Sequence, residues 1–88
     1  MTQNIIADAE KWRIAKFEAL GKACIEAFHE AENVWQAVEE YRLTIRREIL
    51  RREQSGQATT RERAEYEEVK EMAEYFANKL ATAEMRGV

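Results

Sequence analysis

The sequence predicts an all-α protein: an antiparallel helical hairpin with a long first helix, which dimerises into a helical bundle. Three observations predict this fold class. The 88 residues include no proline and three glycines, and good helix formers such as Ala, Glu, Arg and Lys dominate. Apolar residues recur every three or four positions over long stretches, as one face of a helix requires. No segment shows the two-residue alternation of a half-buried strand.

The first helix is expected over about residues 4–54. An apolar stripe runs along it and consists of Ile5, Ala9, Trp12, Phe17, Leu20, Cys24, Phe28, Ala31, Trp35, Val38, Tyr41, Ile45 and Ile49. The stripe keeps its phase through residues 29–33, where a turn would normally reset it. This continuity favours one helix, roughly 75 Å long at the usual rise per residue.

A second arrangement splits this helix near residues 29–33. Asn33 precedes Gln36 by three positions, which fits a capping pair at the start of a new helix. Residues 29–32 would then form a turn, and a compact three-helix bundle would result. Gly21 weakens a helix by about 1 kcal/mol relative to alanine but rarely breaks one. The sequence leaves both architectures open and favours the long hairpin.

The loop of the hairpin is expected at residues 55–59. Gly56 can adopt the left-handed conformation that ends a helix. Thr59 precedes Glu62 by three positions, which fits a capping box at the start of a second helix over about residues 60–86. A short loop makes consecutive helices antiparallel neighbours. Residues 1–88 are therefore expected to form a single helical domain.

The second helix is too short to cover the whole apolar stripe of the long first helix. Pairing around the loop places Ala83 opposite Ala31, so the N-terminal part of the stripe has no cover from its own chain. Each large apolar side chain left in water forgoes about 1.5–3 kcal/mol, and such a surface marks an interaction site. A homodimer is the simplest solution. The expected partner or dimer interface consists of Ile5, Trp12, Phe17, Leu20, Cys24, Ile25 and Phe28.

Charge is distributed unevenly, although the chain as a whole has a net charge of −3. Residues 41–63 hold seven arginines and three glutamates, whereas the segments on either side are acidic. One hypothesis is contact with the phosphates of DNA or RNA. The other is a solvated face with internal pairs such as Glu48 with Arg52. No nucleic-acid-binding motif is present, so nucleic acid is the less favoured partner. The arginines are Arg42, Arg46, Arg47, Arg51, Arg52, Arg61 and Arg63.

The reactive residues do not form a pattern typical of an enzyme. Cys24 is the only cysteine, lies on the apolar stripe and is expected to be a buried structural thiol. A lone cysteine suits a reducing compartment, most simply the cytoplasm. His29 follows Glu26 at the spacing used in di-iron bundles, but one such motif is too few for that site. We therefore expect no enzymatic activity, no metal and no cofactor.

No apolar run approaches the length that spans a bilayer, so no membrane partner is expected. The first residues lack the basic and apolar regions of a signal peptide.

The sequence predicts function only as a class. The favoured hypothesis is a small helical protein-interaction module, a homodimeric adaptor or inhibitor that binds a target protein. Compact, proline-free helical proteins of this size are frequent among phage and mobile-element accessory proteins, which is an analogy of style and not of descent. The alternative is a nucleic-acid-binding accessory or regulatory protein that uses the arginine-rich tip. A subunit of a larger coiled-coil assembly is a third hypothesis.

Overall fold

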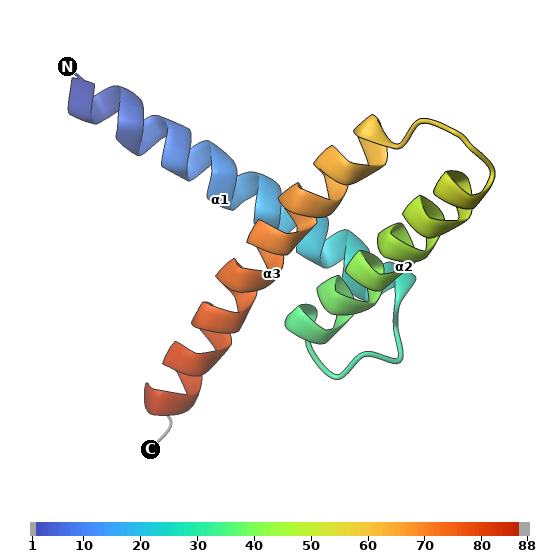
Figure 1. Ribbon diagram of the computed structural model, residues 1–88. Coiled ribbons are helices and arrows are strands. Elements are labelled where there is room, and N and C mark those ends of the chain that lie inside the picture. The colour runs from blue at the N-terminus through green and yellow to red at the C-terminus, as the bar shows by residue number, and fades with distance from the viewer. Residues whose placement is uncertain (1, 87–88) are drawn as a thin grey trace.

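The computed structural model describes the backbone of residues 2–86 and the side chains of residues 8–83. This part of the chain forms three helices and no strand: α1 (Thr2–Ala27), α2 (Val34–Gln54) and α3 (Thr60–Arg86). Figure 1 shows α2 and α3 as an antiparallel hairpin, with α1 passing behind α3 at a steep angle. The all-α fold class is therefore confirmed.

The predicted continuous helix over residues 4–54 is wrong, because the chain turns between α1 and α2 at residues 28–33. The backbone N–H of Ala31 donates to the Phe28 carbonyl at 2.9 Å and tightens this turn. Both residues still pack against the core from the turn. The apolar stripe therefore keeps its phase although the helix does not continue. The structure is compatible with the alternative of three helices and a break near residues 29–33.

Asn33 begins α2 as its N-cap. Its backbone is extended, and its side-chain oxygen accepts a hydrogen bond from the Gln36 backbone N–H at 2.8 Å. The Gln36 side chain accepts in return from the Glu32 backbone N–H at 2.5 Å. These reciprocal bonds satisfy backbone donors that the helix start would otherwise leave unpaired. The capping pair that the sequence offered as an alternative is therefore present.

Replacing Asn33 with alanine is expected to lower the free energy of unfolding by about 1 kcal/mol, because the cap acceptor is lost. Urea denaturation followed by circular dichroism measures this change. Asn33→Ser keeps a side-chain acceptor and is expected to retain most of the stability. A serine variant as unstable as the alanine variant would show that the cap is not the cause.

α2 ends at Gln54, and Gly56, two residues further on, has a φ of 72°, in the left-handed region. The Gly56 N–H donates to the Glu53 carbonyl at 3.1 Å, and the Gln57 N–H donates to the Arg52 carbonyl at 2.9 Å. This pair of bonds is a Schellman motif, which requires a residue without a Cβ penalty at the left-handed position. The loop at residues 55–59 follows from it and separates α2 from α3.

The start of α3 differs from the predicted capping box. The Thr59 hydroxyl accepts from Arg63 Nε at 3.1 Å. The Glu62 carboxylate does not reach back along its own helix but pairs with Arg52 of α2 at 3.3 Å. Of the two residues predicted to form the capping box, Glu62 therefore ties α3 to α2, whereas Thr59 bonds within the first turn of α3.

All three helices contribute to one core. Val38 of α2 and Met72 of α3 are its largest fully buried side chains. Among residues 8–83, the buried apolar residues are Phe17, Cys24, Ala37, Val38, Ile45, Ile49, Val69, Met72, Ala73 and Phe76. Because Phe17 and Cys24 belong to α1, the N-terminal helix folds back and completes the core of its own chain.

Gly21 is buried where α1 meets the other two helices. A Cβ atom placed on Gly21 would lie 2.6 Å from Phe76 Cζ and 2.8 Å from Val34 Cγ2, closer than van der Waals contact permits. The missing side chain therefore lets α1 approach α2 and α3 closely. The sequence indicated only that this glycine weakens the helix.

The molecule extends over 46 × 39 × 20 Å. In Figure 1 the first turns of α1 and the last turns of α3 project in different directions from the region where the helices cross. None of the helices in the described part of the chain has the length and apolarity that a membrane crossing requires.

Candidate interaction surface

The structure places four of the seven predicted interface residues against the chain's own core. Phe17 and Cys24 are buried, with 3% and 6% of their surface exposed. Leu20 and Phe28 are half-buried and pack against them. These side chains therefore contact α2 and α3, where the sequence placed a partner molecule. Ile5 lies outside the residues whose side chains are described.

The remaining two predicted interface residues are exposed. Trp12 has 80% of its surface in solvent, the largest value among the exposed large apolar side chains, and Ile25 has 44%. Lys11, Ala15 and Lys16 surround Trp12 in a shallow hollow on α1. The sequence predicted that Trp12 lies on a segment that the rest of the chain leaves uncovered. In the structure its indole is exposed to solvent.

Contacts with α3 fix which side of α1 points outward. Arg13 pairs with Glu71 at 3.2 Å, and Lys16 pairs with Glu68. The Phe17 ring lies 5.8 Å from the Tyr75 ring, between centroids. Because residues of a helix at spacings of three, four and seven share one face, Ala15 and Ala19 lie on the same side as Trp12. Both alanines are exposed, so this outward face of α1 carries small side chains beside one large apolar side chain, that of Trp12.

Glu18 holds the flank of α1 to the C-terminal half of α3. Its carboxylate accepts hydrogen bonds from Lys79 at 2.6 Å and from the Tyr75 hydroxyl at 2.8 Å. These two bonds hold the pKa of Glu18 below its usual range. The contact is exposed and adds little stability, but it helps to fix the orientation of α1.

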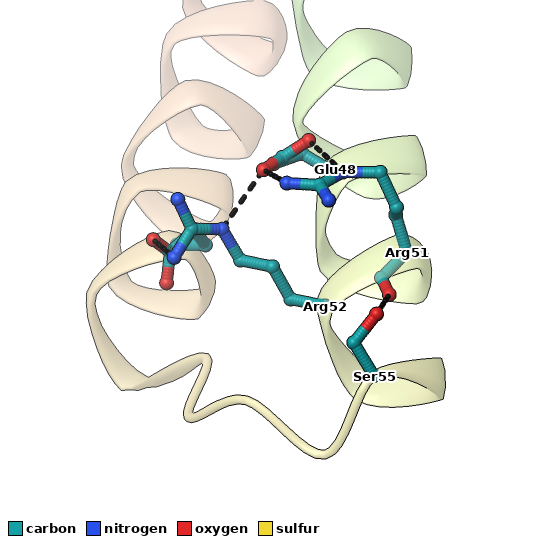
Figure 2. Close-up of polar contacts among 5 residues, drawn as sticks. Glu48, Arg51, Arg52 and Ser55 are labelled. Carbon is teal, nitrogen blue, oxygen red and sulfur yellow. Dashed lines mark hydrogen bonds and ion pairs between the residues drawn. The ribbon is translucent and has the colours of Figure 1, made fainter.

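The arginine-rich tip of the hairpin is partly neutralised by its own glutamates. Figure 2 shows Glu48 between Arg51 and Arg52, which donate to its carboxylate from successive positions of α2. These bonds lower the pKa of Glu48 to about 2. The Ser55 hydroxyl donates to the Arg51 carbonyl at 3.2 Å, which closes the end of the helix. The predicted pair of Glu48 with Arg52 is confirmed, at 2.8 Å.

Two further arginines of the tip have internal partners. Arg42 pairs with Glu39 at 2.5 Å, and Arg63 pairs with Glu53. The other three arginines are exposed and have no ion pair within the described part of the chain: Arg46, Arg47 and Arg61. Four of the seven predicted phosphate-contacting residues therefore already hold a carboxylate.

No family model, no curated protein and no solved structure matches this chain. The candidate site is therefore defined by its own chemistry. Two surfaces stand out: the outward face of α1 around Trp12, and a stripe on α2 that includes two of the unpaired arginines.

The stripe on α2 contains residues that the sequence analysis did not select. Leu43 is 39% exposed and Leu50 is 50% exposed, and they lie off the main apolar stripe that builds the core. The spacing of seven between them, with Arg46 and Arg47 in between, was the signal that could have indicated a second face.

Two titratable groups that pack inside the fold, the Tyr41 hydroxyl and the Cys24 thiol, have raised pKa values. The Tyr41 hydroxyl donates to the Glu65 carboxylate and so links α2 to α3, and this bond raises the pKa of Tyr41 to about 12. Burial raises the pKa of the Cys24 thiol. A raised pKa disfavours the nucleophilic thiolate and agrees with a structural role for this cysteine.

The turn between α1 and α2 forms an open hollow of about 390 Å³ beside His29. His29 lines this hollow, and both His29 and Glu26 are exposed. Within the described residues, no group of three His, Cys, Asp or Glu side chains could hold a metal ion.

Proposed function

We propose that this chain is a non-enzymatic protein-interaction module that works as a homodimer, an adaptor or inhibitor whose dimer contact is the outward face of α1. The observation that carries the proposal is the 80% exposure of Trp12. Tryptophan is enriched among the residues that dominate binding energies, and leaving its apolar surface in water forgoes a few kcal/mol. A partner that covers Trp12 recovers this energy.

Small residues beside Trp12 support contact with another helix. Ala15 and Ala19 are exposed on the same side of α1 and present little bulk. The distance between packed helix axes depends on the side chains at the contact, so alanines permit a close approach. The Trp12 indole of one copy then packs over the alanines of the other.

The charges on this face favour an antiparallel pair of α1 helices. In a parallel pair, Asp8, Lys11 and Lys22 would each meet the same charge on the second copy. In an antiparallel pair centred on Ala15, Asp8 of one copy lies opposite Lys22 of the other, because each is seven residues from the centre. Charge complementarity of this kind sets orientation more than affinity.

A dimer of this kind displays two copies of any other surface on the chain, which suits an adaptor or an inhibitor of a multivalent target. The alternative of nucleic-acid binding has less support, because ion pairs already occupy Arg42, Arg51, Arg52 and Arg63.

Trp12→Ala is expected to raise the dissociation constant of the dimer by about 30-fold or more, as truncation of a central tryptophan anchor costs about 2 kcal/mol. Sedimentation equilibrium of the full chain measures this change. Leu50→Ala, an exposed apolar residue of α2, serves as the matched control and is expected to leave the dimer intact. The proposal fails if the wild-type chain stays a 10.3 kDa monomer from the micromolar range upward, or if both variants weaken the dimer equally.

A further inference from the structure

A second uncovered surface lies on the outer side of α2. Leu43 and Leu50 are seven residues apart and therefore share a face of the helix, and both are substantially exposed. Arg46 and Arg47 lie between them and are exposed as well. We call these four residues the leucine–arginine stripe. Neither α1 nor α3 covers it.

The chain supplies carboxylates to the arginines around this stripe but not to those within it. Glu39 pairs with Arg42 on one side, and Glu48 pairs with Arg51 on the other. Arg46 and Arg47 have no ion pair within residues 8–83. The stripe therefore combines two guanidinium groups that lack an ion pair among the described residues with two aliphatic side chains that are 39% and 50% exposed.

The edge of the stripe opens into a groove between α2 and α3. Arg46 and Leu50 form part of its rim, and its volume is about 300 Å³. The other lining residues are Ile49, Glu53, Arg63, Tyr66 and Glu67. A partner side chain that enters this groove meets both apolar and charged side chains, a combination that is usual at protein interfaces.

We infer that the leucine–arginine stripe docks an acidic amphipathic helix of a different protein. Apolar residues of that helix, at spacings of three, four and seven, would pack on Leu43 and Leu50. Glutamates or aspartates beside them would pair with Arg46 and Arg47, whose planar guanidinium groups suit carboxylates. This inference goes beyond the dimer contact, because it uses another helix and another partner.

Two faces of a second copy of the chain, the acidic side of α3 and the outward face of α1, do not match this surface. The exposed acidic side of α3 carries Glu67, Glu71 and Glu74, yet none of the exposed large apolar side chains in the described residues belongs to α3. The outward face of α1 offers Trp12, but lysines accompany it and would repel the arginines. Charge and apolar surface together therefore point to a heterologous partner.

Nucleic acid fits the stripe less well than an acidic helix does. A phosphate backbone pairs with arginines but provides no apolar surface for Leu43 and Leu50, which would stay in water.

The test uses a fluorescein-labelled synthetic helix of about 21 residues, six turns long, with leucines on one face and glutamates on both flanks. The matched control peptide has lysine at every glutamate position. Fluorescence anisotropy is expected to show micromolar binding of the acidic peptide to the full chain and no binding of the basic one. The double variant Arg46→Glu/Arg47→Glu is expected to lose binding at least tenfold and to bind the lysine peptide instead, which also shows that it is folded.

Two further variants make the outcome decisive. Arg61→Glu reverses an arginine that also lacks an ion pair within residues 8–83 but lies outside the stripe, and it is expected to bind the acidic peptide as the wild type does. Leu43→Ser/Leu50→Ser tests the apolar half and is expected to weaken binding at least tenfold. Equal binding of both peptides, or binding that survives the double reversal, would overturn the inference.

A duplex DNA probe at low salt distinguishes the remaining class of partner. Binding of DNA through Arg46 and Arg47 without binding of the acidic peptide would replace the inferred partner with nucleic acid and so overturn the inference. Trp12→Ala is expected to keep its affinity for the acidic peptide, so a failed dimer and a failed docking surface give different results.

Discussion

Replacing Phe17 with alanine is expected to lower the free energy of unfolding by about 3–5 kcal/mol, a large part of the stability of a small domain. The Phe17 side chain is 3% exposed, packs on Tyr75, and has the Arg13 guanidinium over its ring at 5.3 Å. Alanine would leave a cavity between α1 and α3 and remove the main apolar contact of that part of α1. Urea denaturation followed by circular dichroism measures the loss.

Trp12→Ala provides the matched control, because it removes a larger aromatic ring from the same helix. At concentrations below the dissociation constant of the dimer, it is expected to change the stability by no more than about 0.5 kcal/mol, as for other surface positions. Phe17→Leu keeps most of the buried volume and gives a measurable value if the alanine variant does not fold. Similar losses at positions 12 and 17 would mean that α1 does not pack on the hairpin as described.

Side chains added at Gly21 are expected to destabilise the fold in proportion to their size. A Cβ atom there meets Phe76 and Val34 at distances below 3.0 Å, and Phe76 is itself buried at 2% exposure. Overpacking of this kind costs about 1–3 kcal/mol, and occasionally more. The better helix propensity of alanine offsets about 1 kcal/mol of this cost. Gly21→Ala is therefore expected to lose less stability than Gly21→Val, whose side chain is larger and β-branched.

Ala19→Val controls for the helix propensity of valine, since Ala19 is exposed on the outward face of the same helix. At concentrations below the dissociation constant of the proposed dimer, its expected loss is below about 0.7 kcal/mol. Thermal or urea unfolding of the three variants side by side separates the steric effect from propensity. A Gly21→Val variant as stable as Ala19→Val would show that α1 does not approach the other helices closely at this point.

The fold class and the second turn could be predicted because their signals are local. Gly56 is the residue type that a left-handed helix end requires, and the structure uses it so. The first turn could not be predicted from the stripe, because Phe28 and Ala31 point toward the core from within the turn. Periodicity reports which residues face the core, and it does so even where the helix is interrupted.

The candidate site could be predicted only in part. Trp12 is 80% exposed, in line with its predicted place on an uncovered segment, whereas Phe17 and Cys24 are covered by helices whose path depends on the turn. Leu43 and Leu50 were missed because the core stripe of α2 accounts for the apolar pattern without them. Separating a core face from a docking face requires knowing which sides of each helix the chain itself covers.

One helix, α1, both closes the interior of the protein with Phe17 and displays Trp12 to the outside. A partner that binds the outer side of this helix in the native state, and does not bind the unfolded chain, adds its binding free energy to the stability of the whole fold. In the proposed dimer, assembly and folding are therefore linked, and the melting temperature is expected to rise with protein concentration. A cell could then remove unassembled copies simply because they unfold more often.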